Sequence, residues 1–253
     1  MPLDIRQFPC LSDNYGFLVR DEETGAVACV DTPDAAEVLA QLDASGWGRL
    51  DLILNTHWHP DHAGGNARVQ AATGATIVAP EAEAARIGRV DRAVTEGDRV
   101  DLGATAFQVI DTRGHTAGHI SYWSEADRVA FVGDTLFALG CGRLFEGTPQ
   151  MMWKSLSKLA ALPGDTRVYC AHEYTAANAR FALSVDDGPA LAARAAEVFA
   201  RRERGEPTVP TTIALERSTN PFLRAPEIAR RHGWAAADDV EAFGLVRAAK
   251  DAF

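Results

Sequence analysis

The chain has 253 residues, 47% of them apolar and 24% charged, and its formal net charge is −10. This length allows one large or two small domains, and the apolar fraction is enough for a sizeable core. The acidic balance, with a pI near 5.2, argues against nucleic-acid or anionic-membrane binding by the whole surface, although it permits a local basic pocket.

The first part of the chain alternates predicted strands with short helices. β-rich runs and buried apolar runs predict strands, and apolar residues three or four apart predict helices. Strands are predicted at residues 15–19, 26–30, 50–55, 76–79, 100–102 and 106–110, and helices at 34–42 and from 63 to about 74.

The second part changes from strands to helices after His172. A hairpin at 120–123 and 129–132 is followed by a helix that Thr148 can cap and by a last strand at 166–170. Beyond residue 174 no strand is predicted, and helices are expected at 190–204, 226–232 and 238–249. We therefore expect an α/β domain over residues 1–173 and a small all-helical domain over 174–253.

No basic segment followed by an apolar one opens the chain, and no apolar run is long enough to span a membrane. The cysteines lack metal-binding CxxC spacing, which favours free thiols in a reducing compartment. They are Cys10, Cys29, Cys141 and Cys170. We expect a cytoplasmic protein that contacts neither membrane nor nucleic acid.

A dense group of potential metal ligands follows the strand at 50–55. His57, His59, Asp61 and His62 lie within six residues, on the turn from that strand to the next helix. Side chains of this kind packed so closely repel protons and one another unless a cation holds them. The segment therefore predicts a metal site.

Three later residues whose side chains can bind metal also follow predicted strands, namely His115, Asp134 and His172. If these strands share one sheet direction, all seven side chains meet at one edge. Seven nitrogen and oxygen ligands exceed the need of one ion, so two ions that share a carboxylate fit better. Asp134, isolated from the other ligands, is the expected bridge.

The pattern His-x-His-x-Asp-His resembles the signature of the metallo-β-lactamase superfamily. The resemblance implies an αββα sandwich and two divalent ions, with a metal-bridging hydroxide as the nucleophile. It also implies that His57, His59 and His115 hold one ion, and Asp61, His62 and His172 the other. We expect zinc, with iron or manganese compatible with the same ligands.

Beyond these motifs, nearly the whole chain resembles the hydroxyacylglutathione hydrolase (glyoxalase II) family. The resemblance rests on the segments 11–15, 141–147, 172–175, 219–224 and 247–251. It implies hydrolysis of S-D-lactoylglutathione and related 2-hydroxyacylglutathiones to the hydroxy acid and glutathione, the second step of methylglyoxal detoxification. We expect a monomer whose partner is this thioester.

Six residues occupy positions that the resemblance assigns to the glutathione part of the substrate: Arg143, Phe145, Tyr174, Asn178, Arg247 and Lys250. Arg247 and Lys250 lie one helical turn apart and match the family's carboxylate clamp. Arg143 replaces a lysine of animal members and keeps the charge. Phe145 replaces a tyrosine, so a hydroxyl contact is lost there.

Two alternatives remain at the level of sequence. The first is another member of the superfamily, such as a glutathione-persulfide dioxygenase with a single iron. The second is a metal-binding module without enzymatic activity. A further candidate is His119, which either orients a metal ligand by a hydrogen bond or is merely structural.

Overall fold

The computed structural model describes residues 3–253, which divide into two compact units. The first unit contains the chain up to Asp111 and the segment Thr116–Gly133. The second unit contains Thr112–His115 and Asp134–Phe253. The helical tail therefore clusters with residues 134–173 in one unit, whereas the sequence predicted a domain boundary at residue 174.

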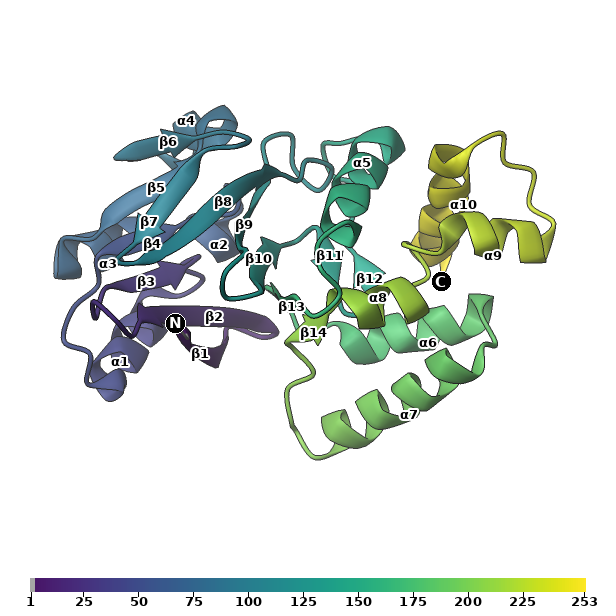
Figure 1. Ribbon diagram of the computed structural model, residues 1–253, viewed down its shortest axis with the longest axis horizontal. Coiled ribbons are helices and arrows are strands. Elements are labelled where there is room, and N and C mark those ends of the chain that lie inside the picture. The colour runs from purple at the N-terminus through teal and green to yellow at the C-terminus, as the bar shows by residue number, and fades with distance from the viewer. Residues whose placement is uncertain (1–2) are drawn as a thin grey trace. The chain divides into compact units, whose positions relative to one another are not determined.

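A six-stranded mixed sheet forms one layer of the first unit, with its strands in chain order (Figure 1). The first three strands pair antiparallel and the last four pair parallel, with the third strand common to both sets. The strands are β1 (Leu3–Cys10), β2 (Asn14–Asp21), β3 (Val27–Val30), β4 (Leu52–Leu54), β5 (Thr76–Pro80) and β6 (Arg92–Val94).

Helices α1 (Ala35–Ser45) and α3 (Asn66–Thr73) pack on this sheet. Asp34 caps α1 by accepting hydrogen bonds from two backbone amides, and Gly46 ends it in the left-handed conformation. The helices bury side chains such as Val38 and Val69 against the sheet. The remaining helical turns of the unit are α2 (Pro60–Ala63), η1 (Glu81–Glu83) and α4 (Ala84–Ile87).

An antiparallel meander forms a second layer of the same unit. Its strands are β7 (Arg99–Leu102), β8 (Thr105–Asp111), β9 (Ile120–Ser124) and β10 (Val129–Gly133). The ring of Phe131 on β10 lies 5.6 Å from that of Phe17 on β2 and 6.1 Å from that of Phe107 on β8. Aromatic packing therefore joins the two layers.

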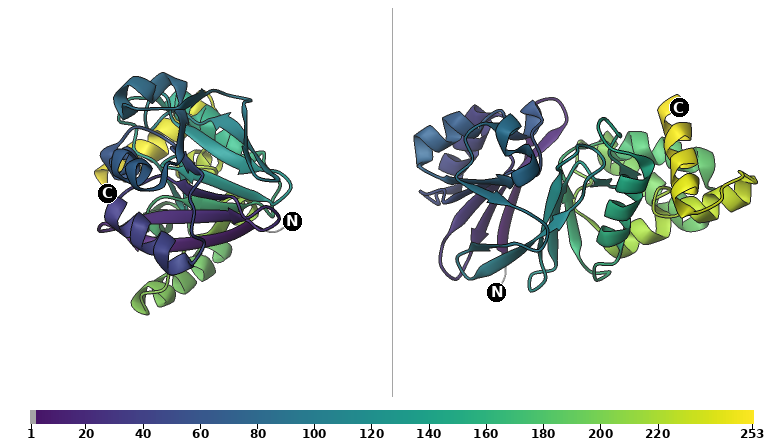
Figure 2. Two further views of the ribbon diagram at one scale, coloured as in Figure 1. Left: turned by 90° about the vertical axis from the view of Figure 1, so that its left-hand side faces the viewer. Right: turned by 90° about the horizontal axis from the view of Figure 1, so that it is seen from above.

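The second unit is mainly helical, with two short strand pairs. Helices α6 and α7 run side by side, and α9 packs against α10, which runs in a different direction (Figures 1 and 2). The helices are α5 (Pro149–Ala160), α6 (Thr175–Val185), α7 (Pro189–Glu203), α8 (Ile213–Thr219), α9 (Ala225–His232) and α10 (Asp239–Ala252). The strands are β11 (Leu136–Phe137), β12 (Gly140–Cys141), β13 (Arg167–Cys170) and β14 (Thr211–Thr212).

The helices predicted at 190–204, 226–232 and 238–249 are confirmed as α7, α9 and α10. The prediction that no strand follows residue 174 was wrong, because β14 pairs with β13. In this pair Thr212 lies opposite Arg167. Two residues are too few to show the alternation that predicts a strand. No helix in the part of the chain that the structure describes is long and apolar enough to cross a membrane.

The condition that the ligand-bearing strands share one sheet direction is not met, because these strands belong to two sheets. β4, which precedes the His-x-His-x-Asp-His segment, lies in the mixed sheet. β8 and β10, which precede His115 and Asp134, lie in the meander. The prediction that the candidate ligands follow strand ends was nevertheless correct, because each of these strands ends just before the loop that carries its ligand.

Candidate metal centre and substrate site

The His-x-His-x-Asp-His segment of the first unit leads from β4 into α2. Pro60 stands at the first helical position, where its missing N–H costs no hydrogen bond. The His57 Nε2 atom lies 2.9 Å from His59 Nδ1, and His62 Nε2 lies 3.5 Å from Asp61 Oδ2. Ligand atoms thus face each other in pairs within this short loop.

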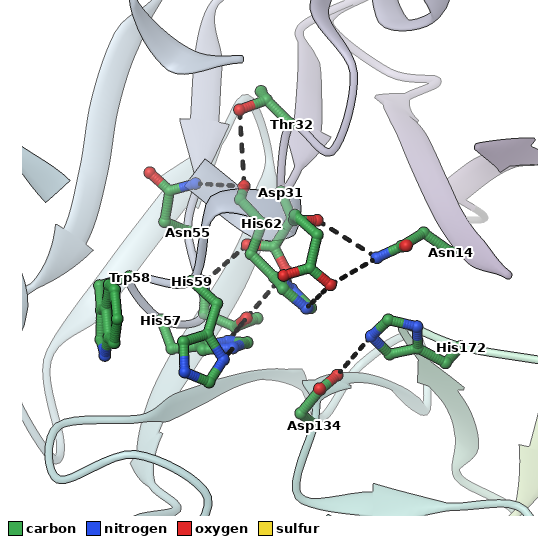
Figure 3. A network of polar contacts seen from close by, with 12 residues as sticks. Asn14, Asp31, Thr32, Asn55, His57, Trp58, His59, His62, Asp134 and His172 are labelled. Atoms are coloured by element: carbon green, nitrogen blue, oxygen red, sulfur yellow. Dashed lines mark hydrogen bonds and ion pairs between the residues drawn. The ribbon is translucent and has the colours of Figure 1, made fainter. Parts of the chain in front are cut away.

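Asp31, directly after β3, orients the side chains of this loop through hydrogen bonds (Figure 3). Its buried carboxylate accepts hydrogen bonds of 2.8 Å from the Thr56 amide, the Thr56 hydroxyl and His62 Nδ1. Since the Thr56 hydroxyl donates to Asp31, its oxygen is left to accept from His57 Nδ1, 3.0 Å away. One carboxylate therefore orients two imidazoles.

These contacts determine which ring nitrogens carry protons. In His57 and His62 the proton lies on Nδ1, so Nε2 presents a lone pair. A carboxylate behind a metal-binding histidine fixes both the tautomer and the ring orientation in this way. The two side chains are fully or almost fully buried, and their rings are prepared to bind a cation.

Asn14 and Glu83 also stabilise the loop, Asn14 by contacts to Asp61 and Glu83 by contacts to backbone amides. The Asn14 amide donates to Asp61 Oδ2 at 3.1 Å and to the Asp61 carbonyl at 3.2 Å. The buried Glu83 carboxylate accepts from the Trp58 amide at 2.7 Å and from the Gly118 amide at 2.8 Å. Asn14 lies within the family-like segment 11–15, whereas nothing in the sequence distinguishes Glu83 or Asp31 from other acidic residues.

His119 lies in the same unit, fully buried and with its ring 4.9 Å from that of His57. It packs against the His57 ring, and the two planes are inclined by 31°. A role in orienting a metal ligand stays a prediction.

The second unit supplies His115, Asp134 and His172. The two oxygens of Asp134 face different imidazoles: Oδ2 lies 3.4 Å from His115 Nε2, and Oδ1 lies 3.3 Å from His172 Nε2. Figure 3 shows the contact between Asp134 and His172. Two ligand atoms about 2.1 Å from the same ion lie roughly 3.4 Å apart at tetrahedral angles. These spacings therefore fit a carboxylate that bridges two ions.

The imidazoles of this second set are also oriented. His115 Nδ1 donates to the Arg143 carbonyl at 2.8 Å, so the lone pair of the neutral ring lies on Nε2. The His172 ring stacks on Tyr174, with 4.7 Å between centroids and planes 3° apart. All the nitrogen and oxygen donors thus have the chemistry that zinc, iron and manganese accept.

The six candidate substrate residues all lie in the second unit and fall into two groups. Arg143, Phe145 and Tyr174 are exposed and Lys250 is half-buried, so they are accessible to a ligand. Asn178 and Arg247 are buried. The Asn178 amide donates to the Ala138 carbonyl, while Arg247 donates to the Cys141 carbonyl and to Asp251.

Lys250 lies in a cationic environment. Burial lowers the pKa of its ammonium group, as do the charges of Arg247, Arg180 and Arg143, although Asp251 opposes them. Its ammonium also lies 5.3 Å from the centre of the Phe181 ring. Because several positive charges face one another here, an anionic ligand would relieve their repulsion.

Comparison with known proteins supports what the fold and these clusters indicate. Residues 17–172 match the metallo-beta-lactamase superfamily, and the chain belongs to that superfamily. Its fold accordingly combines mixed α/β sheets with a C-terminal helical region. The superfamily and the His/Asp clusters indicate a binuclear metal site.

The remaining residues identify the branch of the superfamily. Residues 173–253 match the C-terminus of hydroxyacylglutathione hydrolase. Proteins with that name from Maricaulis maris and Erythrobacter litoralis are 57% and 54% identical, over 98% and 99% of this chain and 98% and 100% of theirs. The chain is a member of the hydroxyacylglutathione hydrolase family, whose members are metal-dependent hydrolases.

Solved structures of lower sequence identity share the fold of this chain. ETHE1 from Myxococcus xanthus has a TM-score of 0.69 and 26% identity, and the match covers 98% of this chain and 99% of that one. TTHA1623, solved in a di-iron-bound form, has a TM-score of 0.62 and 26% identity over 87% of this chain and all of that one. The higher identity of the named hydrolases makes ETHE1 only a distant neighbour.

Proposed function

We propose that the protein hydrolyses S-D-lactoylglutathione and related 2-hydroxyacylglutathiones to the hydroxy acid and glutathione. The observation that carries the proposal is the Asp134 carboxylate, whose two oxygens face different imidazole nitrogens at 3.3 and 3.4 Å. The substrate is taken from relatives that carry the hydrolase name over nearly their whole length.

In this proposal seven residues would hold two divalent ions. His57, His59 and His115 would bind one ion, Asp61, His62 and His172 would bind the other, and Asp134 would bind both. We propose zinc, and the same donors would also accept iron or manganese, so metal analysis of the purified protein identifies the ion.

The two ions, when bound, supply a hydroxide at neutral pH and polarise the thioester carbonyl. The protein's own residues supply position. Asp31 and the Arg143 carbonyl keep the ligand imidazoles in the tautomer that leaves Nε2 free to bind. The departing thiol has an ordinary pKa of about 8.5, so it leaves as thiolate without a general acid.

The glutathione moiety is anionic, and we propose that it binds to the cationic surface around Lys250. Arg143 and Lys250 are the accessible charges, while Phe145 and Tyr174 offer apolar contact. Arg247 and Asn178 are buried, so we propose that they act on the substrate mainly by supporting the residues around it.

The test combines metal analysis with a thioester hydrolysis assay. The wild-type protein should contain about two ions per chain and hydrolyse S-D-lactoylglutathione. Asp134→Ala should contain less metal and lose hydrolysis. The matched control is Asp187→Ala, because the side chain of Asp187 is 89% exposed and should affect neither quantity. A full metal content in Asp134→Ala would disprove the bridge, and a wild-type protein inert toward the thioester would disprove the function.

A further inference from the structure

A short hairpin connects all three ligands of the second unit. We name residues 134–143 the ligand hairpin. Asp134 begins it, and the Arg143 carbonyl at its other end accepts the hydrogen bond from His115 Nδ1. Between them, Phe137 places its ring edge-on against His172, at 6.0 Å between centroids. A shift of the hairpin would therefore move every ligand of this set.

The backbone pairing within the hairpin is short. Two residue pairs form its ladder, Leu136 with Cys141 and Phe137 with Gly140, and the Gly142 amide donates to the Thr135 carbonyl at 3.1 Å. A two-stranded hairpin of this length is marginal in water. Its turn also contains a non-glycine residue in the left-handed conformation, Leu139, with φ of 58°. Other parts of the unit must stabilise this conformation.

Two buried amides from the helical tail bind the hairpin backbone. The Asn220 amide nitrogen donates to the Phe137 carbonyl at 3.1 Å and to the Gly140 carbonyl at 2.9 Å. The Asn178 amide donates to the Ala138 carbonyl at 3.2 Å. Three carbonyls of the turn are thereby satisfied by side chains.

A carboxylate and a guanidinium complete the set. The Glu216 carboxylate accepts from the Leu139 amide at 2.9 Å, and Arg247 donates to the Cys141 carbonyl at 3.3 Å. Five consecutive residues, 137–141, therefore each have a backbone group bound by a side chain from helices α6, α8 and α10 or from the residue after α8. We name Asn178, Glu216, Asn220 and Arg247 the polar cluster.

The polar cluster is itself rigidly held. Glu216 is fully buried and accepts hydrogen bonds from Arg194, Thr211 and Asn220. Asn220 is also fully buried, and its side-chain oxygen Oδ1 accepts from the Phe222 amide at 2.9 Å. Buried networks in which each member is satisfied specify one arrangement, and loss of one member leaves costly unpaired groups.

We propose that the polar cluster positions the metal ligands of the second unit through the ligand hairpin. The helical tail then has a second role beside substrate binding, since it sets the geometry of Asp134 and His115. This inference rests on the proposed metal-dependent hydrolysis, and it assigns Asn178 and Arg247 to positioning rather than to direct contact with glutathione.

The test of the positioning role replaces a hydrogen-bond-donating amide of the polar cluster by a carboxylate of the same shape, which can only accept. Asn220→Asp places a carboxylate against two carbonyls and Glu216, so the hairpin should shift. We expect zinc affinity, measured by competition with a chromophoric chelator, to fall about tenfold or more. The kcat should fall for a glutathione thioester and for a simple thioester without the peptide alike, while KM for the glutathione thioester stays within about twofold.

Two additional variants keep the experiment informative if Asn220→Asp folds poorly. Asn178→Asp removes a single donor, and Gly140→Ala would place a Cβ 2.3 Å from the Asn178 amide nitrogen. Both should change zinc affinity in the same direction. Arg224→Ala is the matched control, because Arg224 pairs with Asp186 and Glu227 in the same unit and has no bond to the hairpin.

The outcomes separate the two proposals. Wild-type zinc affinity and kcat in Asn220→Asp, Asn178→Asp and Gly140→Ala, with a change in thermal stability alone, would overturn the positioning role. A rise in KM confined to the glutathione thioester would also overturn it. Absence of hydrolysis in the wild-type protein would instead contradict the proposed function, and the zinc affinities would still test the positioning role.

Discussion

At the scale of single residues, the candidate metal centre depends on side chains that are not themselves predicted ligands. Asp31 is the clearest case, because its carboxylate has three partners and two of them lead to histidines. It adopts a left-handed backbone conformation, with φ of 57°, which is uncommon for a residue other than glycine. An unusual backbone at such a position is expected where function constrains it.

Asp31→Asn should therefore weaken metal binding without removing a ligand. One oxygen becomes an NH2 group, which donates, so the side chain can no longer accept all three hydrogen bonds from Thr56 and His62. We expect metal affinity or activity to fall about ten- to a hundredfold, measured by chelator competition and thioester hydrolysis. Asp34→Asn is the control, because Asn caps a helix as well as Asp does. Equal effects in the two variants would exclude a specific role for Asp31.

Lys250 allows a test of substrate binding that includes pH. Lys250→Ala should raise KM for the glutathione thioester by about tenfold, the lower end for a charge-assisted hydrogen bond of about 1.5–3 kcal/mol. A thioester without the peptide should be unaffected, because the contact is remote from the chemistry. Equal losses on both substrates would indicate that Lys250 acts through folding.

The lowered pKa of Lys250 gives the sign of the pH effect. Burial and neighbouring arginines disfavour its charged form, so it loses its proton at a lower pH than an ordinary lysine with a pKa near 10.5. Affinity for the anionic substrate should fall as pH rises through that lowered pKa, and Lys250→Ala should abolish this alkaline fall. An alkaline fall of the same size in the variant would exclude Lys250 as its cause.

At the scale of elements, the loop that presents His115 packs directly on α5. Gly114 has φ of 144°, and a Cβ there would lie 2.8 Å from the Met152 Cβ. The Gly147 amide donates to the Gly114 carbonyl at 3.1 Å. Only glycine fits this position, and His115 follows it directly.

Gly114→Ala should thus lower stability and metal affinity together. Strain of this kind costs about 1–3 kcal/mol, measurable by urea unfolding, and displacement of His115 should weaken zinc binding. Gly205→Ala is the matched control: its φ is 73° and nothing lies within 4 Å of its Cβ position. It should lower stability by about 1–2 kcal/mol with unchanged zinc affinity. Unchanged zinc affinity in Gly114→Ala would show that the loop tolerates the shift.

At the scale of the whole molecule, metal binding should contribute to the stability of the fold. The proposed ligands extend from residue 57 to residue 172, and ligand binding to the folded state alone raises stability by about 4 kcal/mol at a thousand times the dissociation constant. For a chain of this size, about 2–4 °C per kcal/mol gives a loss on the order of 10 °C in Tm when a chelator removes the metal.

Circular dichroism with and without EDTA, followed by added Zn²⁺, measures this effect. The shift should shrink as pH falls below about 6.5, because imidazoles must lose their protons to bind metal. Asp134→Ala should show a smaller shift than the wild-type protein. An unchanged Tm after complete removal of the metal would contradict the expected coupling of binding to folding.

The sequence by itself determined the features that depend on neighbouring residues. The His-x-His-x-Asp-His spacing, the strand before it and the helices of the tail are patterns within about ten residues, and hydrophobic periodicity identifies such elements. The same local patterns identified the superfamily and the helical C-terminal region, which the comparisons confirm.

Only the tertiary structure decided which distant groups support those patterns. Asp31 contacts His62 across 31 residues of sequence, and Arg247 reaches Cys141 across 106. The two-residue strand β14 and the buried state of Asn178 likewise depend on partners far away in the chain. Local periodicity carries no information on such contacts, because burial and hydrogen-bond partners are set by packing after the chain has folded.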